Sequence, residues 1–152
     1  MSDLRDLYQE VVIDHSKRPR NLHKMADADR TAQGYNPLCG DKVAVYLKLA
    51  NGKVSDLSFE GSGCAISTAS ASIMTEVVKG KTVEEALALF DRFHHLVTGD
   101  TSPDVQVPEL GKLQVFSRVS DYPARVKCAT LVWHTLRSAL EGADGVISNE
   151  QD

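Results

Sequence analysis

Hydrophobic side chains near the start of the chain recur every three or four positions, which is the spacing of one face of an α-helix. The positions that follow this spacing are Leu4, Leu7, Tyr8, Val11, Val12 and His15. Ser2 or Asp3 can cap the helix, and Pro19 ends it because proline cannot continue the hydrogen-bond ladder. The basic run His15–Arg20 suits the negative end of the helix dipole, and a docking role for this run is the alternative.

A strict alternation of apolar and polar positions follows further along the chain. Val43, Val45, Leu47 and Leu49 alternate with Lys42, Ala44, Tyr46 and Lys48. Such a pattern predicts a half-buried strand. Asn51-Gly52 comes next and is a strong two-residue hairpin signal, so Val54–Phe59 is expected to return as the partner strand. With a further short strand near Arg30–Gln33, these segments predict a three-stranded antiparallel meander.

The pattern of the second half of the chain predicts a series of helices. The expected segments are a small-residue helix over Cys64–Lys79, a helix from the capping box Thr82–Glu85 to Val97, a loop over 98–108, a short helix over Leu110–Val119, and a last helix from Pro123 to Leu140. Gly80 is a good helix stop, and Pro123 suits the first turn of a helix. The helices therefore follow the strands along the chain.

The length, composition and net charge of the chain limit the classes of protein to which it can belong. The 152 residues suit one domain with a real core, and residues 143–152 are polar and expected to form a disordered tail. The net charge of −4 argues against nucleic acid as a partner, which calls for a basic face. The chain shows neither a hydrophobic run of the ~20 residues that span a bilayer nor a signal peptide. A cytoplasmic protein without a membrane partner is expected.

The three cysteines of the chain offer the clearest chemistry. An odd number of cysteines leaves at least one free thiol, and cytosolic thiols stay reduced. Cys39, Cys64 and Cys128 together with Asp41 make four ligands, the number that a tetrahedral zinc site takes. Cys39 and Asp41 are two residues apart, so in an extended loop both side chains project to the same side. The carboxylate is the hardest of the four ligands, and we expect it to be the most replaceable.

Several of these residues also have a purely structural interpretation. A lone cysteine is usually a small buried hydrophobe, and the turn Gly61–Cys64 can be purely structural. Arg125 lies three residues before Cys128 on one helix face, where it can offset the charge of a thiolate cluster or simply face solvent. The histidines lack zinc-binding spacing, and the chain has neither a Gly-x-Ser-x-Gly elbow nor a dinucleotide-binding glycine pattern. The favoured site uses no histidine.

Four segments together resemble the IscU-like family of iron–sulfur cluster assembly proteins. They are Asp14–Asn21, Asn36–Asp41, Gly61–Ser70 and Tyr122–Leu131. Within the family the chain looks most like the SufU branch of zinc-dependent sulfur acceptors. Scaffold-type members carry a histidine where this chain has Lys127, and a chaperone-binding Leu-Pro-Pro-Val-Lys segment where it has Asp121–Arg125. The stretch Thr98–Val119 looks like the insertion of the SufU branch.

The resemblance implies an α+β fold for residues 1–142, with the antiparallel sheet covered by helices. Cys39, Asp41, Cys64 and Cys128 would bind zinc at one exposed end. Cys39 would accept persulfide sulfur from a cysteine desulfurase, a pyridoxal-phosphate enzyme, after a side chain of that partner replaces Cys39 on the zinc. Arg125 would stabilise the anion formed, and the sulfur would pass to a downstream iron–sulfur assembly complex. The chain would thus act as a sulfurtransferase.

Two other functions stay open at this point. In the first, the same four ligands, Cys39, Asp41, Cys64 and Cys128, hold iron or a [2Fe–2S] cluster, and the chain is an assembly scaffold; Lys127 in place of histidine weighs against it. In the second, zinc merely stabilises a small domain. An aspartate ligand weighs against that reading, because closed structural sites favour cysteine and histidine.

Overall fold

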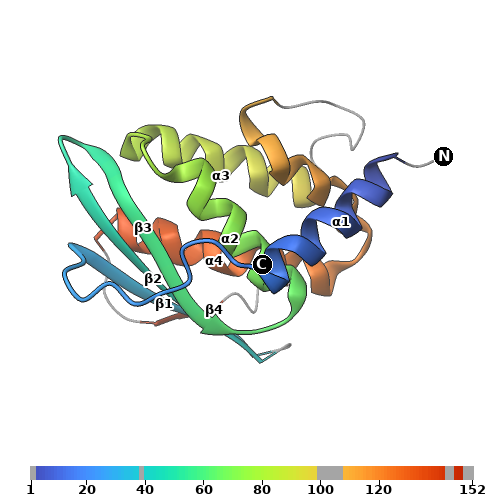
Figure 1. Ribbon diagram of the computed structural model, residues 1–152, viewed down its shortest axis with the longest axis horizontal. Helices are drawn as coiled ribbons and strands as arrows, with labels where there is room; N and C mark the ends of the chain where they lie inside the picture. The colour runs from blue at the N-terminus through green and yellow to red at the C-terminus, as the bar shows by residue number, and fades with distance from the viewer. Residues whose placement is uncertain (1–2, 38–39, 99–107, 143–145, 149–152) are drawn as a thin grey trace.

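The computed structural model describes residues 3–37, 40–98, 108–142 and 146–148. The elements are α1 (Asp3–Lys17), β1 (Arg30–Asn36), β2 (Asp41–Ala50), β3 (Lys53–Ser62), α2 (Ala65–Val78), α3 (Val83–Thr98), η1 (Pro108–Asp121), α4 (Pro123–Leu140) and β4 (Val146–Ser148). Figure 1 shows these elements in their spatial arrangement. The strands β1, β2 and β3 precede the helices α2 to α4 along the chain, and the short β4 follows them, so the α+β fold expected from the sequence is confirmed.

The predicted meander forms the body of the sheet. β1 pairs antiparallel with β2, and β2 pairs antiparallel with β3. Asn51 and Gly52 adopt φ values of 56° and 75°, which is the left-handed conformation that a tight two-residue turn of this kind requires. Val43, Val45 and Leu47 are buried, because alternate residues of β2 face the helices.

The tail departs from the sequence-based expectation. Residues 143–152 were expected to be disordered, but Val146–Ser148 forms β4, which pairs in parallel with residues 33–35 of β1. The order in the sheet is β3-β2-β1-β4. The physical reason is that β1 would otherwise offer an unpaired edge, and the short Val-Ile segment has the β-branched composition that strands favour.

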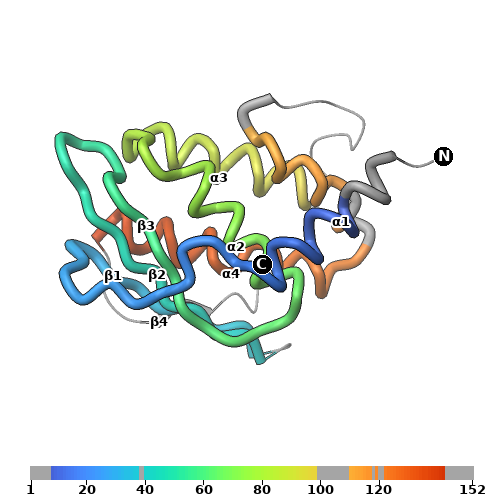
Figure 2. The backbone as a smooth tube through the Cα atoms, viewed as in Figure 1, coloured from blue at the N-terminus to red at the C-terminus, as the bar shows by residue number. Residues whose placement is uncertain are grey.

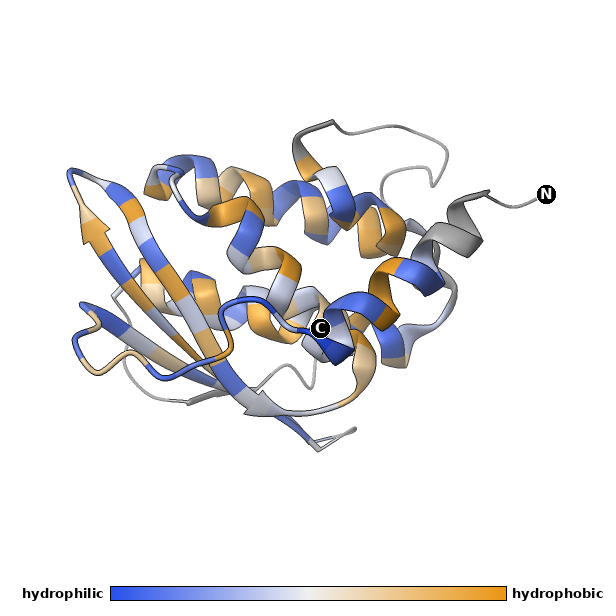
Figure 3. Ribbon diagram, viewed as in Figure 1, coloured by the Kyte–Doolittle hydropathy of each residue, from blue (hydrophilic) through white to orange (hydrophobic). Residues whose placement is uncertain are grey.

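The helices pack on the sheet and on one another through small and aromatic side chains. A Cβ atom on Gly34 of β1 would collide with the hydroxyl of Thr135, so β1 and α4 approach closely. Within α2, the Ser70 hydroxyl donates to the Ala129 carbonyl of α4 at 2.6 Å. Trp133 of α4 is fully buried and stacks on Phe93 of α3 with ring centroids 5.0 Å apart. Figure 3 shows hydrophobic residues on the facing sides of these helices.

The expected helix boundaries hold where local signals set them. Thr82 and Glu85 form the reciprocal capping box, with hydrogen bonds of 2.9 and 3.1 Å. The segment Leu110–Val119 is helical but of the 3-10 type, with a kink at Gly111. Most of the expected loop over 98–108 lies outside the described residues. None of the described helices combines the length and hydrophobicity needed to cross a membrane.

Candidate metal centre

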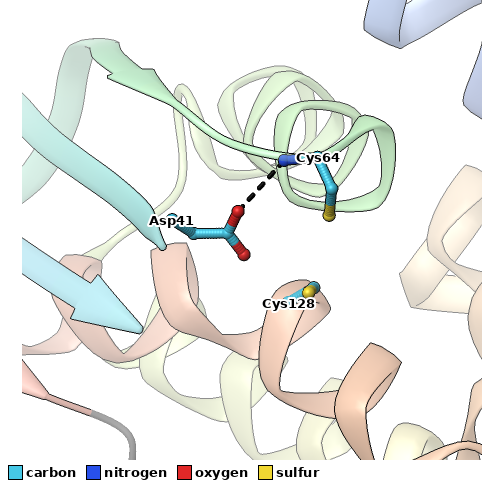
Figure 4. Close-up of side chains that lie close together, drawn as sticks. All are labelled: Asp41, Cys64 and Cys128. Carbon is cyan, nitrogen blue, oxygen red and sulfur yellow. Dashed lines mark hydrogen bonds between the residues drawn. The ribbon is translucent and has the colours of Figure 1, made fainter. Parts of the chain in front are cut away.

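Three side chains from three separate elements meet at one end of the sheet. Asp41 begins β2, Cys64 caps the start of α2, and Cys128 lies in the early turns of α4. One ligand atom from each lies within 4.8 Å of the others. Figure 4 shows the carboxylate and both sulfurs pointing toward a common space. Residues far apart in the sequence are thus gathered into one potential ligand set.

Asp41 is held firmly, although a carboxylate at the start of a strand would normally be solvated. Its side chain is 1% exposed, and Oδ1 accepts a hydrogen bond of 3.0 Å from the backbone N–H of Cys64. Gly63 makes this approach possible, because a Cβ there would lie 2.5 Å from Oδ1. The other oxygen, Oδ2, is buried and has no hydrogen-bond partner. A buried carboxylate oxygen without a partner is costly unless a cation takes it.

Cys64 sits where a thiolate is favoured. Its sulfur accepts a hydrogen bond of 3.4 Å from the N–H of Ser67, in the first turn of α2. A hydrogen bond with the Cys128 thiol is the largest influence, and together with the N–H groups of Ser67 and Ile66 it lowers the pKa of Cys64 to about 6. Burial and the charge of Asp41 act in the opposite direction. The thiolate is therefore the major form of Cys64 at neutral pH.

Cys128 is the third described residue of the site. It is 5% exposed and lies one turn and a half after Pro123, which begins α4. Proline suits that position because the first helical N–H groups have no partner within the helix. Because α4 starts at Pro123, the thiol of Cys128 lies opposite that of Cys64. The two thiols and Oδ2 of Asp41 then face each other (Figure 4).

The donor set fits a zinc ion. Two thiol sulfurs and one carboxylate oxygen are ligands that Zn²⁺ accepts, and the partnerless oxygen of Asp41 is the observation that favours a cation. The fourth expected ligand, Cys39, lies outside the described residues. Its flanks are placed, because the N–H of Gly40 donates to the carbonyl of Asn36 at 2.8 Å and Gly40 has a φ of 74°. Asn36 and Gly40, which flank Cys39 in the chain, are therefore held together beside Asp41.

The contacts of Asp41 show how the carboxylate is held in place. Asp41 is buried, and Oδ1 accepts the hydrogen bond from the backbone of Cys64 while Oδ2 is left for a cation. That the carboxylate is the most replaceable of the four ligands stays a prediction. The firm attachment is a tertiary contact between β2 and the β3–α2 turn, which residue type alone does not reveal.

Arg125 lies at the surface, one turn before Cys128. Its guanidinium stacks over the ring of Tyr122 at 4.5 Å, and it forms no ion pair with a residue in the described ranges. Tyr8 of α1 is a nearby group that sequence reasoning counted only as part of an apolar stripe. Burial raises the pKa of Tyr8, the charge of Arg125 opposes this, and Cys64 and Cys128 add to it. Arg125, Tyr8 and the two thiols therefore share one electrostatic neighbourhood.

The histidines of the described residues stay outside this cluster. His15, at the end of α1, is fully buried and its Nδ1 lies 2.7 Å from the Ser72 hydroxyl. His94 and His134 meet edge to face, with ring centroids 5.7 Å apart, between α3 and α4. Both arrangements bind elements of the fold together, and neither brings a histidine to the thiols.

Comparisons with known proteins agree with this architecture. The NifU-like N terminal domain family matches residues 7–129. An iron-sulfur cluster assembly scaffold protein IscU of Streptococcus pyogenes serotype M1 is 44% identical over 141 residues, covering 93% of this chain and 87% of the relative. The zinc-dependent sulfurtransferase SufU of Bacillus subtilis is 40% identical over 144 residues, covering 95% and 96%.

A solved structure extends the likeness to the fold. The N-terminal part of a nitrogen-fixing NifU-like protein from Brucella abortus superposes with a TM-score of 0.81 at 26% identity, covering 92% of this chain and 96% of that one. The two curated relatives differ in subtype, one being a scaffold and the other a sulfurtransferase. The chain therefore belongs to the NifU-like N-terminal domain family, the IscU and SufU proteins of iron–sulfur cluster assembly.

Proposed function

We propose that the chain is a zinc-dependent acceptor of persulfide sulfur from a cysteine desulfurase. The observation that carries this proposal is the set of convergent donors, in which the partnerless oxygen of Asp41 faces the thiols of Cys64 and Cys128 with no histidine among them. Lys127 stands before the third cysteine and cannot act as an imidazole ligand. The zinc-dependent sulfurtransferase of Bacillus subtilis, which covers almost the whole chain, supports the same function.

Zinc would be held by Cys39, Asp41, Cys64 and Cys128, and when bound it keeps the thiols deprotonated at neutral pH. The chemistry of transfer is thiolate attack on a persulfide. The thiolate of Cys39 attacks the terminal sulfur of the persulfide of the desulfurase. A new sulfur–sulfur bond forms on Cys39, the bond within the persulfide of the partner breaks, and the thiolate of the partner leaves with the electron pair.

Cys39 is the proposed acceptor among the three thiols. Cys128 is 5% exposed, and Cys64, although exposed, has its sulfur bonded to the N–H of Ser67. Cys39 stands between Pro37 and Gly40 in the sequence, a composition typical of the exposed loops that partners reach. Arg125 carries a cation that no carboxylate of the described residues neutralises, and it lies within one turn of Cys128. It is placed to stabilise the negative charge of the transferred sulfur.

A scaffold for a [2Fe–2S] cluster is the second candidate. The observation that favours it is the 44% identity to an IscU scaffold protein, together with the same donor set, since thiolates and a carboxylate can also hold iron. In that case Cys39, Asp41, Cys64 and Cys128 would retain an iron–sulfur cluster as cargo to be passed to other proteins.

One set of measurements separates the two candidates. Metal analysis and the visible spectrum of the purified protein distinguish colourless zinc protein from brown protein containing iron and acid-labile sulfide. A desulfurase assay with wild-type chain and with Cys39→Ala follows, with mass spectrometry of tryptic peptides after turnover. We expect zinc, stimulation by the wild type only, and added sulfur on Cys39. Sulfur found on Cys64 or Cys128 but never on Cys39 would contradict the proposed acceptor.

A further inference from the structure

A groove runs along the edge of the sheet and ends at the metal centre. It has a volume of about 270 Å³ and lies between the end of α1, the edge strand β3 and the start of α2. The residues that form its floor and outer wall are Pro19, Leu22, Val43, Phe59 and Ala71. Figure 2 shows the segment after α1 crossing β3, where the N–H of Phe59 donates to the Asn21 carbonyl at 3.0 Å. This hydrogen bond fixes the wall of the groove.

The inner end of the groove is made by two residues that also shape the metal centre. Gly63 and Ser67 line it. Gly63 leaves room for the carboxylate of Asp41, and the N–H of Ser67 donates to the sulfur of Cys64. A chain seated in the groove would therefore reach the ligands of the metal without passing through the core.

The rim of the groove is cationic. Lys42 lines it, and Lys17 and Arg18 follow Ser16, which also lines it. All three cations are exposed, and none forms an ion pair with a residue in the ranges described. Neighbouring Arg20, by contrast, is bonded to Asp14 at 2.9 Å. Leu22 adds an apolar side chain that is 47% exposed.

We propose that this groove receives an extended segment of the protein that delivers the sulfur, with a large apolar side chain flanked by carboxylates. The naming of this partner rests on the proposed function. A cavity of about 270 Å³ is below the usual range for a whole small-molecule ligand, but it accommodates one side chain of a protein. The apolar floor buries that side chain, and the unpaired cations attract the flanking carboxylates and steer the encounter.

The basic run at the end of α1 gains a role in this arrangement. A solvated helix end alone does not account for cations grouped with an apolar groove that leads to reactive thiols. Seating a segment of the partner there would hold its persulfide near Asn36 and Gly40, the described residues that flank Cys39 in the sequence. The groove then contributes to binding of the partner and not to the chemical step.

The test compares two double variants in full-length zinc protein. Lys17→Glu/Arg18→Glu alters the rim. Lys53→Glu/Arg92→Glu makes the same charge change at two residues outside the groove lining, one at the start of β3 and one in α3. Binding to a cysteine desulfurase is measured against salt concentration, with zinc content as the check on folding. We expect the rim variant to weaken binding roughly 10-fold or more and to flatten its salt dependence, with maximal stimulation unchanged. Equal binding by the two variants would overturn the proposal.

A second measurement tests the groove without the desulfurase. The probe is the peptide acetyl-Asp-Glu-Leu-Phe-Asp-Glu-amide, and the control peptide has Ser-Ser in place of Leu-Phe. We expect the first peptide to shift the amide resonances of Leu22, Gly63 and Ser67, and the shifts to vanish in Leu22→Ser. No shift at these residues would overturn the groove as a docking site. Shifts without binding of wild-type chain to a desulfurase would instead contradict the partner and the proposed function.

Discussion

Two polar clusters lie against α2 and differ in how completely their atoms are paired. The histidine network consists of His15, Ser72, Glu76 and Lys112, and the metal centre consists of Asp41, Cys64 and Cys128. In the network, Nδ1 of His15 contacts the Ser72 hydroxyl at 2.7 Å, and the Lys112 ammonium contacts Nε2 at 3.2 Å and Glu76 at 3.3 Å. The network therefore satisfies itself with protein groups.

The metal centre does not satisfy itself in this way. Oδ1 of Asp41 accepts a hydrogen bond from the N–H of Cys64, but Oδ2, the other oxygen of the same carboxylate, is buried and has no hydrogen bond. Native proteins pair nearly all their buried polar groups, and a buried anionic oxygen without a partner is the costliest exception, so a cation is expected here. The comparison teaches that burial alone does not identify a site, whereas incomplete pairing beside reactive thiols does. The predictions below test this distinction.

The largest effect is expected from removing a thiol of the metal centre. Cys128→Ser should lose zinc and lower the melting temperature by about 10 °C, because ligation energy is also folding energy and a ligand at 1,000 times its Kd contributes about 4 kcal/mol. Zinc content and differential scanning calorimetry measure both changes. A chelator added to the wild type is the control and should reproduce the loss. Full zinc content in the variant would refute the assignment of Cys128.

The histidine network should affect stability without affecting zinc. His15→Ala removes the side-chain partner of the buried Ser72 hydroxyl and empties the space of a fully buried imidazole, so we expect a cost of about 2–4 kcal/mol and unchanged zinc stoichiometry. Burial, Arg20 and Lys112 lower the pKa of His15, while Glu76 and Asp14 oppose them.

The sign of the resulting pH dependence follows from that shift. Because the pKa of His15 is lower in the folded chain than in the unfolded chain, the folded state loses stability as pH falls below about 6.5. Denaturant unfolding at several pH values should show this loss in the wild type and a smaller loss in His15→Ala. Loss of zinc in His15→Ala would show that the two clusters are not separable.

Asp41→Asn is the most direct test of the partnerless oxygen. The amide keeps an oxygen for the N–H of Cys64 but replaces the anionic ligand, so zinc affinity should fall by more than the roughly 10–100-fold typical of outer-shell changes. The metal-free variant should be at least as stable as the metal-free wild type, because a buried carboxylate is removed. Competition with a chromophoric chelator and denaturant unfolding give the two numbers. A strongly destabilised metal-free variant would make Asp41 a structural residue.

A smaller effect concerns reactivity. The Cys128 hydrogen bond and the N–H groups at the start of α2 lower the pKa of Cys64 to about 6. In metal-free Cys39→Ala protein, the alkylation rate of Cys64 by iodoacetamide should therefore rise with a midpoint near pH 6, and it should be nearly constant above pH 7.5. Peptide mass spectrometry assigns the site. A midpoint near the ordinary value of about 8.5 would remove the electrostatic argument.

The smallest structural effect is expected at Arg125. Arg125→Ala removes an exposed side chain that rests on Tyr122, so zinc content and melting temperature should change little, whereas stimulation of a desulfurase should weaken. Arg125→Lys keeps the charge but stacks less well on Tyr122. Its stimulation of the desulfurase should therefore lie between that of the wild type and that of Arg125→Ala. Unchanged stimulation in Arg125→Ala would remove this residue from the mechanism.

Local signals in the sequence determined much of the fold. The turn at Asn51-Gly52, the capping box of Thr82 and Glu85, and the start of α4 at Pro123 are set by residues within four positions of each other. Short-range propensities of this kind act in any tertiary context, so these turns and helix ends could be predicted directly from the sequence. The same holds for the alternation in β2. The donor residue types of the site were also visible, because Cys39, Asp41 and Cys64 each stand beside a glycine in the sequence and Cys128 follows the proline that begins α4.

Only the tertiary structure decided how these residues act on one another. The bond between Asp41 and Cys64, the meeting of Cys64 with Cys128, and the pairing of β4 with β1 join segments far apart in the chain. Such contacts depend on which surfaces pack together, and a side chain's neighbours then set its burial, its hydrogen bonds and its pKa. This is why residue type alone indicated an aspartate ligand, whereas its burial and its hydrogen bond to Cys64 emerged only from the folded chain.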